Sequence, residues 1–403
     1  MEQSSDIESS STNKYPDFSN TQIAFAGKSD SELKETERLF MLMNNSKLVS
    51  IGSVVGKFAL KSGLPFVQSI IKRTLFKHFC GGLNLADCQD VIDDLYKNQA
   101  QSLLDYGVEG KSAEPDLDDT LSEVINAIDF AAANHSVPAA ICKLTGLVDN
   151  DVLIRKQVEG DLDAETQKRY DTFYERVLSA CRRAYDLKVG LLIDAEESWM
   201  QDAMDEVVIE MMAQFNKDQV IIFNTYQMYR KNTLDRLKRD HQRGKDEGFL
   251  IGAKLVRGAY MKKERERARE QGYPSPIHDT KPDTDKDYDA GILYCLDHMD
   301  EISFVCASHN TYSNKVLARA VIDRGIEVDH PHVNFSQLQG MSDYITFNLA
   351  KHGFNAAKYV VYGPVKEVAD FLIRRAEENT SITGEAGREL TLIRQELKRR
   401  GKG

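Results

Sequence analysis

Short apolar runs alternate with longer amphipathic segments over most of the chain, beginning near residue 101. The segments between the runs carry apolar residues at helical spacing, as in Glu165–Tyr185. The eight runs are Ser102–Asp105, Ala139–Leu144, Val189–Ile193, Val220–Asn224, Leu250–Val256, Ser303–Ala307, His332–Phe335 and Lys358–Tyr362. Strands that alternate with helices pair in parallel, so eight such units predict an α/β fold, a (βα)8 barrel of the TIM type. The alternative is an open doubly wound sheet, which usually carries a G-x-G-x-x-G motif that this sequence does not contain.

The same pattern divides the chain into four regions. Residues 1–28 are polar and Ser-rich, and we predict a disordered tail. Residues 29–100 predict an N-terminal helical arm, residues 101–390 the barrel, and residues 391–403 a basic C-terminal tail. Within the arm, the amphipathic stretch Lys47–Cys80 carries six Lys and Arg residues and no Asp or Glu. It would either contact an anionic membrane surface or pack on the barrel with its lysines in water.

Composition narrows the setting of the protein. The net charge of -11 argues against nucleic acid as the main partner, because phosphate binding requires a basic face. The six cysteines form no C-x-x-C motif, which is typical of reduced thiols in an intracellular protein. No apolar run reaches the ~20 residues of a transmembrane helix, and the N-terminus is neither a secretory signal nor a mitochondrial presequence. We therefore predict a bacterial cytoplasmic protein, with the inner face of the cytoplasmic membrane as an option through residues 47–80.

Polar side chains gather at the carboxyl ends of the predicted strands, where barrel enzymes place their functional residues. They are Asp105, Lys143, Asp194, Asn224, Gln227, Lys254, Arg257, Tyr260, Ser308, His309, Asn310, Gln337 and Tyr362. Buried charges are costly unless they are paired or bound to a ligand, so this set predicts a polar binding site. Lys143 by itself would also suit a Schiff-base lyase. A barrel that has lost its catalytic function is a third reading.

Two short motifs do not meet the requirements of the sites that they resemble. The segment Gly107–Ser112 ends like a phosphate-binding loop, but Asp105 stands where the first glycine of that motif is required. The carboxylates and imidazoles at residues 327–332 are metal ligands by type, but no wider spacing supports a site. We predict no metal.

Arg374 and Arg375 lie in a predicted helix that follows the turn Tyr362–Pro364. Adjacent helical residues are about 100° apart around the axis, so both can reach one ligand only near a cleft. Glu378 lies within ion-pair range of Arg374. A solvated helix would explain these residues by themselves, but paired guanidinium groups also fit a carboxylate.

Taken together, these blocks resemble the proline dehydrogenase family, and they are nearer to its monofunctional eukaryotic branch than to its bifunctional bacterial branch. The matching blocks are Ile193–Glu197, Asn224–Gln227, Lys254–Tyr260, Ser308–Asn310, Phe335–Met341, Tyr362–Pro364 and Arg374–Asn379. They extend from about Leu95 to Asn379. The resemblance implies a distorted (βα)8 barrel that binds FAD and oxidises L-proline to Δ1-pyrroline-5-carboxylate, the first step of proline catabolism. Hydride would pass from C5 to flavin N5 and electrons to a membrane quinone, and a separate pyrroline-5-carboxylate dehydrogenase would take the product.

The resemblance also assigns roles to residues. Lys143, Arg374 and Arg375 would bind the substrate carboxylate, Tyr260 and Tyr362 would pack on the proline ring, and Asp194 would organise the pocket. The flavin would be contacted by Asn224, Lys254, Arg257, Gly258, Ala259, Ser308, His309, Asn310, Gln337 and Glu378. The alternative substrate is trans-4-hydroxy-L-proline. Tyr362 favours proline, because relatives that accept the hydroxylated ring have a small residue there.

Overall fold

The computed structural model describes residues 14–44, 69–108, 110–380 and 385–402. Of the basic stretch 47–80, only residues 69–80 are described, so the question of membrane contact lies mostly outside the described residues. No helix in the described part of the chain is long and apolar enough to cross a membrane.

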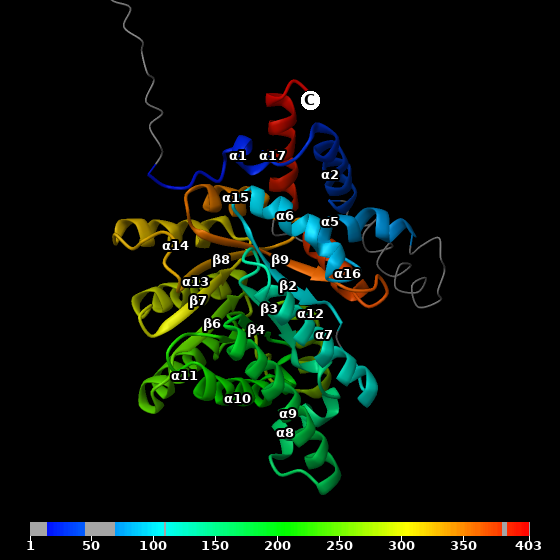
Figure 1. The fold of residues 1–403 in the computed structure, drawn as a ribbon, viewed down its shortest axis with the longest axis vertical. Coiled ribbons are helices and arrows are strands. Elements are labelled where there is room, and N and C mark those ends of the chain that lie inside the picture. Colours follow the sequence, from blue (N-terminus) through cyan, green and yellow to red (C-terminus); the bar gives the residue numbers. More distant parts are fainter. Residues whose placement is uncertain (1–13, 45–68, 109, 381–384, 403) are drawn as a thin grey trace, which may run out of the picture.

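Eight parallel strands form a closed barrel at the centre of the molecule (Figure 1). They are β2 (Gln101–Tyr106), β3 (Ala139–Lys143), β4 (Gly190–Asp194), β5 (Ile222–Gln227), β6 (Ile251–Val256), β7 (Ile302–Ala307), β8 (Val333–Leu338) and β9 (Asn355–Tyr362). Consecutive strands are neighbours, and β9 pairs with both β8 and β2, which closes the barrel. Each strand overlaps one of the predicted apolar runs, and the predicted (βα)8 fold is confirmed.

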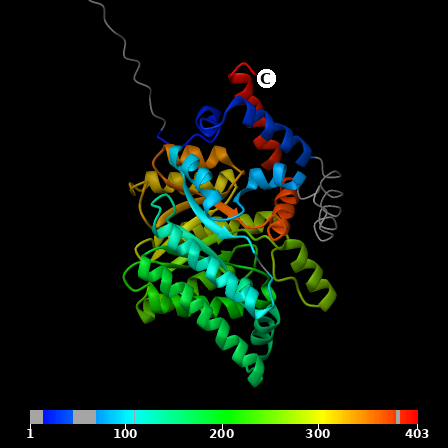
Figure 2. The same ribbon diagram turned by 45° about the vertical axis from the view of Figure 1, so that its right-hand side comes forward.

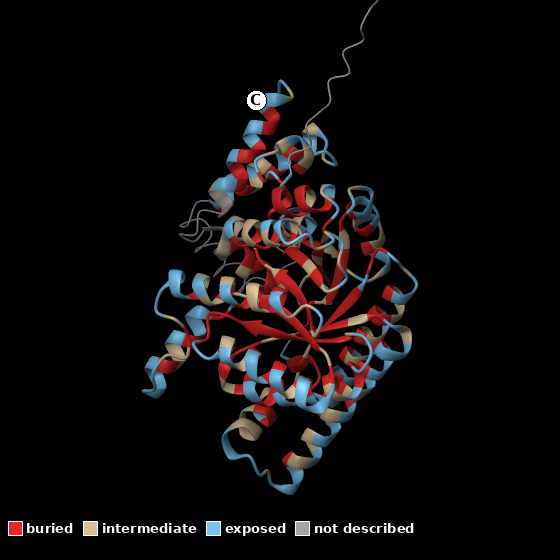
Figure 3. Cartoon of the chain, turned by 90° about the vertical axis from the view of Figure 1, so that its left-hand side faces the viewer, coloured by how far each residue is buried: buried red, intermediate tan, exposed pale blue. Residues whose placement is uncertain are grey.

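The barrel interior and the barrel wall have separate apolar layers, because successive side chains of a strand point to opposite faces. The interior layer consists of Leu103, Ala139, Ile141, Leu192, Phe223, Val305 and Ala357, with Tyr359 packed against it. The opposite faces of the strands pack on the surrounding helices, and Figure 3 shows the buried strands inside a shell of partly exposed helices. Asp105 follows Leu103 by two positions, so its carboxylate enters the interior at the carboxyl end of β2.

Side chains cap the first turn of several of the surrounding helices. They are α7 (Glu114–Ala132), α8 (Asn150–Glu159), α9 (Ala164–Leu187), α10 (Ser198–Phe215), α11 (Thr233–Glu247), α12 (Met261–Gln271), α13 (Lys281–Asp297), α14 (Thr311–Asp323), α15 (Asp343–Lys351) and α16 (Ala369–Thr380), with a short 3-10 turn at Leu144–Gly146. Asp163 accepts from the first backbone N–H groups of α9, and Asn310 does the same for α14. Asn310, the last residue of the predicted block Ser308–Asn310, therefore has a structural role as the N-cap of α14.

The N-terminal segments wrap one side of the barrel. They comprise α1 (Thr21–Ala24), α2 (Asp30–Met43), a π-helical turn (Lys72–Phe76), α5 (Lys77–Phe79), β1 (Cys80–Gly82), a 3-10 turn (Ala86–Cys88) and α6 (Gln89–Lys97). The prediction of disorder is wrong for residues 14–28, because Phe18 and Phe25 are almost fully buried there. Two buried aromatic rings supply apolar area that offsets the entropy lost on ordering a polar segment.

The basic C-terminal tail is also corrected. Residues 391–399 belong to α17 (Glu385–Arg399), which packs against α2 (Figures 1 and 2). Leu390, Ile393 and Leu397 recur at helical spacing and are buried. The charged residues between them hid this apolar stripe in the sequence.

Candidate active site

Five side chains meet inside the barrel at the carboxyl ends of its strands, and we call them the central cluster. They are Asp105 of β2, Lys143 of β3, Asp194 of β4, Lys254 of β6 and Tyr359 of β9. Lys143 Nζ donates to both carboxylate oxygens of Asp105 at 2.5 Å and to Tyr359 Oη at 3.3 Å. Lys254 is ion-paired with Asp194, and Tyr359 Oη donates to the other oxygen of Asp194 at 2.8 Å.

The electrostatics of the two carboxylates differ. Burial raises the pKa of Asp105 and outweighs the opposing effect of Lys143. Burial also acts to raise the pKa of Asp194, but Lys254 and Lys143 outweigh it, so this pKa falls below its usual range. Asp194 is therefore held ionised between two cations, whereas Asp105 depends mainly on Lys143. The cluster can present positive charge to a carboxylate if Lys143 exchanges partners.

Helix α16 adds the predicted arginines. Arg375 is 6% exposed, is ion-paired with Glu378 and stacks on Phe371 at 5.3 Å from the ring centre. Burial lowers the pKa of Arg375. Arg374 lies 5.7 Å from the ring centre of Tyr260, which follows β6. The structure thus brings both arginines and Tyr260 to the same end of the barrel as the central cluster.

Tyr362 lies on the opposite face of β9 from the central cluster. Its ring centre is 5.5 Å from that of Tyr106, its partner in the β2–β9 register. Burial raises its pKa, with Glu123 of the outer helix α7 as the next contribution. The structure therefore places Tyr359, and not Tyr362, beside the predicted substrate residues. The signal was present in the sequence, because residues separated by three positions on a strand face opposite sides.

The predicted flavin residues near β6, β7 and β8 form one hydrogen-bonded network. Arg257 donates to Ser308 Oγ at 2.6 Å and to Ser313 Oγ at 2.9 Å, and its Nε pairs with Asp285 at 2.7 Å. Gln337 donates to the Ser308 carbonyl at 3.1 Å. These contacts hold the segment after β7 against the segment after β6, and they were not predicted.

The turn after β6 requires glycine. Gly258 has a φ of 134°, and a Cβ at this position would meet the ring of Tyr229 at 2.4 Å. Ala259 is exposed. Only a residue without a side chain fits this turn, so Gly258 lets the chain pass closely over the barrel end.

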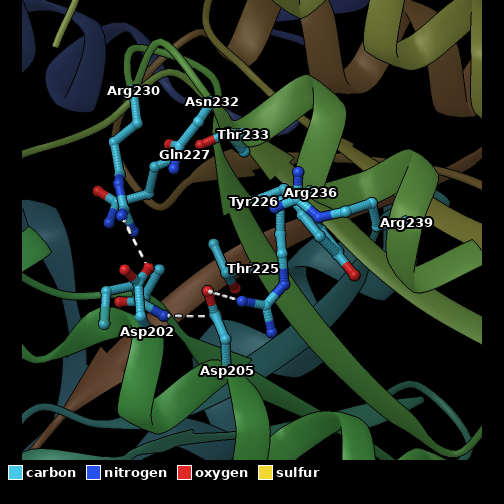
Figure 4. Close-up of a pocket in the computed structure, with 12 residues that line it drawn as sticks. Asp202, Asp205, Thr225, Tyr226, Gln227, Arg230, Asn232, Thr233, Arg236 and Arg239 are labelled. Atoms are coloured by element: carbon cyan, nitrogen blue, oxygen red, sulfur yellow. Dashed lines mark hydrogen bonds and ion pairs between the residues drawn. The ribbon is translucent and has the colours of Figure 1, made fainter. Parts of the chain in front are cut away.

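Asn224 is not brought to this network. Phe223 fills the barrel interior, so Asn224 faces outward, and its amide donates to Asp205 of α10 at 2.9 Å. Asp205 lines a polar pocket between β5, α10 and α11, where it faces Arg236 (Figure 4). Burial raises the pKa of Asp205 to about 6. In this arrangement Asn224 supports a buried carboxylate beside a second pocket.

A profile of the proline dehydrogenase family matches residues 88–388. This chain belongs to the proline dehydrogenase family. It is 31% identical to proline dehydrogenase 2, mitochondrial, of Arabidopsis thaliana, across 92% of this chain and 91% of that protein. It is 38% identical to proline dehydrogenase 1, mitochondrial, of Homo sapiens, across 59% of this chain and 40% of the human protein. The resemblance noted in the sequence is confirmed, and membership supports an oxidoreductase that acts on proline in proline catabolism.

A solved structure supports the fold. Proline utilization A from Bdellovibrio bacteriovorus superimposes with a TM-score of 0.73 and 18% identity, across 92% of this chain and 42% of that chain. The present chain thus spans less than half of that protein and of the human relative. At this identity the likeness concerns the fold alone.

The predicted location is wrong. The eukaryotic relatives are mitochondrial proteins by name, which points to mitochondria and away from a bacterial cytoplasm. The prediction was based on the acidic, Ser-rich composition of residues 1–20, which differs from the Arg-rich composition of a typical presequence.

Proposed function

We propose that this protein oxidises L-proline to Δ1-pyrroline-5-carboxylate with bound FAD. The observation that carries the proposal is the meeting of the central cluster with Arg374, Arg375 and Tyr260 at one end of the barrel. Proline presents a carboxylate, a charged ring nitrogen and a small apolar ring. The central cluster, the two arginines and Tyr260 together offer cations, carboxylates and two aromatic rings at that end of the barrel.

The substrate carboxylate would be bound by Arg374, Arg375 and Lys143. Arginine suits this task because its planar fork of donors matches two carboxylate oxygens. Lys143 would exchange part of its contact with Asp105 for a contact with the substrate carboxylate. Asp105 would keep the ammonium group of Lys143 in place. Tyr260 and Tyr359 would cover the ring, and Asp194 would hold Tyr359 and Lys254 in position.

The donor set also suits a flavin. Lys254 and Arg257 place positive charge at the carboxyl end of β6, and Gly258 lets the turn after β6 pack closely on the ring of Tyr229. Ser308, His309 and Gln337 line the neighbouring strand ends, and Glu378 fixes Arg375. FAD bound there would accept the hydride from proline C5. The protein's own part is to orient C5, exclude water and hold charges fixed around the reacting ring.

We further propose that electrons pass to a membrane quinone and that a separate pyrroline-5-carboxylate dehydrogenase takes the product. The family likeness is the support for both. The mitochondrial names of the relatives support a mitochondrial location for this chain as well.

Two alternatives have specific consequences. A Schiff-base lyase needs a free amine, whereas the ammonium group of Lys143 is paired with Asp105 at 2.5 Å. Oxidation of trans-4-hydroxy-L-proline needs room for a hydroxyl group, and we propose that Tyr359 restricts that room. Equal kcat/KM for the two substrates would contradict the preference for proline.

The decisive experiment is an anaerobic titration of the purified protein with L-proline. We expect a yellow protein whose flavin absorbance bleaches on addition of proline. Arg375→Ala should retain the flavin spectrum and raise KM for proline by at least tenfold, because one bidentate carboxylate contact is lost. A colourless protein would reject the proposal, and an unchanged KM would reject the assignment of Arg375.

A further inference from the structure

A second group of charges, all buried except the partly exposed Lys28, lies outside the barrel wall, and we call it the terminal cluster. It consists of Lys28, Asp343, Lys358 and Glu389. The two oxygens of Asp343 accept from Lys28 Nζ at 2.7 Å and from Lys358 Nζ at 2.8 Å. Lys358 of β9 has no exposed side-chain surface. Lys28 comes from the N-terminal segment and Glu389 from α17, so the cluster joins both terminal segments to the barrel.

The terminal cluster holds the loop between β8 and α15, which lies at the carboxyl end of a barrel strand. Lys358 Nζ donates to the carbonyl of Met341 at 2.6 Å. Glu389 accepts from the backbone N–H of Ser342 at 2.7 Å. Ser342 has a φ of 53°, a left-handed conformation that is unfavourable for a serine unless its surroundings stabilise it. Glu389 supplies part of that stabilisation.

Ser342 links this loop to the candidate active site. Its hydroxyl lies 3.0 Å from Nδ1 of His309, which follows β7. Burial lowers the pKa of His309 to about 3, and Arg375, Lys358 and Arg257 act in the same direction. The imidazole is therefore neutral and carries one proton. Which ring nitrogen holds that proton depends on the hydrogen bond made by the other. A hydroxyl can donate to or accept from Nδ1, so the Ser342 hydroxyl fixes the orientation of the His309 ring through its contact with Nδ1.

We propose that Glu389 is a positioning residue for His309, because it holds Ser342 in the left-handed conformation that aims the hydroxyl at the imidazole. The inference rests on the proposed function, in which His309 contacts FAD. Glu389 touches neither substrate nor flavin in this scheme. Helix α17 then helps to position an active-site residue, although the helix itself lies outside the barrel.

The first test compares FAD affinity in the full-length chain. Glu389→Ala should raise the Kd for FAD about tenfold, which is within the range of coupling between groups in one hydrogen-bond network. Glu389→Gln keeps a carbonyl acceptor for the Ser342 N–H and should retain most of the affinity. The matched control is Glu37→Ala, which breaks the 2.8 Å pair between α2 and Arg394 of α17 but removes no acceptor from Ser342.

A double-mutant cycle tests the route. If Glu389 acts through His309, then Glu389→Ala should have little further effect on the Kd for FAD when His309→Ala is already present. Additive effects of the two substitutions would overturn the proposal, as would an equal loss of affinity in Glu37→Ala.

A flavin-independent readout separates this proposal from the proposed function. The ¹⁵N shift of His309 Nδ1 in the flavin-free protein should report the hydrogen bond to Ser342 in the wild type and its loss in Glu389→Ala. Ser342→Ala should give the same change of shift and serves if Glu389→Ala does not fold. An unchanged His309 spectrum in these variants would overturn the positioning role. Failure of the wild type to bind FAD would instead reject the proposed function.

Discussion

Strand β9 carries two neighbouring residues whose side chains face opposite sides of the barrel wall. Lys358 faces outward into the terminal cluster, and Tyr359 faces inward to the central cluster. Lys358 is fully buried and its partners are all supplied by the protein. In the central cluster, Lys143 and Asp194 keep 9% and 15% of their side-chain surface exposed. The difference teaches that Lys358 is enclosed by its protein partners, whereas Lys143 and Asp194 keep surface within reach of a ligand.

The two clusters should therefore fail in different ways. Removing one partner from a buried ion pair leaves an uncompensated charge, which is strongly destabilising. A site that binds a ligand has to tolerate partial exchange of partners. Substitutions of Lys28, Asp343 and Lys358 in the terminal cluster should chiefly change stability, and substitutions in the central cluster should chiefly change catalysis.

The largest effect is expected for Asp343→Ala. This change removes the acceptor shared by Lys28 and Lys358, and the free energy of unfolding should fall by about 3–5 kcal/mol. Urea denaturation measures it, with Asp161→Ala in the exposed α8–α9 loop as the control. Stability close to that of the wild type would show that the terminal cluster is not a closed structural unit.

Lys143→Met should lower kcat/KM for proline about 100-fold, as expected when one fixed donor is lost from an active site. Burial already raises the pKa of Asp105, so the carboxyl left behind can take up a proton, and the loss of stability should be smaller than for Asp343→Ala. Steady-state kinetics and urea denaturation of the same preparation measure both quantities. A large loss of stability with normal kinetics would reverse the comparison.

The two tyrosines provide a matched pair on one strand. Tyr359→Phe removes the hydrogen bond to Asp194 and should reduce kcat/KM about tenfold. Tyr362→Phe should leave kcat/KM unchanged, because the buried Tyr362 hydroxyl has no hydrogen-bond partner among the described residues. The opposite order of effects would restore Tyr362 to the substrate site.

The smallest effect concerns pH. Burial, followed by Asp343, raises the pKa of Glu389 to about 7. The folded state then binds more protons than the unfolded state between the ordinary pKa of a glutamate and about 7, so this group should make stability fall as pH rises through that window. The pKa of Asp194 is lowered, so this group has the opposite effect on the pH dependence of stability. It contributes stability above the ordinary pKa of an aspartate. Melting temperatures of Glu389→Gln should therefore depend less on pH between 5 and 7 than those of the wild type.

The sequence allowed the barrel to be predicted because its strands are buried on both faces and appear as continuous apolar runs. It did not reveal which face each polar residue occupies. Asn224 and Tyr362 carried the right chemistry for a site, but their parity relative to Phe223 and Tyr359 turns them outward. That parity becomes readable only when the register of each strand is known.

The sequence was least informative about long-range partners. The sequence pattern assigned Lys28 to the N-terminal tail and Glu389 to the last segment of the barrel. No motif near either residue indicates that both reach the β8–α15 loop. Ion pairs between distant segments depend on how complete elements pack. Arg374, Arg375 and Lys254 could be assigned to one end of the barrel because each belongs to a recognisable block, and their roles in substrate and flavin binding stay a prediction.

Strand β9 also imposes an order on how the chain can assemble. Gln101 at the start of β2 is in register with Ala357, and Cys80 of β1 pairs with Val361. These contacts join residues that are far apart in the sequence, and contacts of such long sequence separation form slowly. The barrel cannot close on the ribosome until β9 has emerged. Until then, the edges of β2 and β8 that pair with β9 remain exposed in the nascent protein.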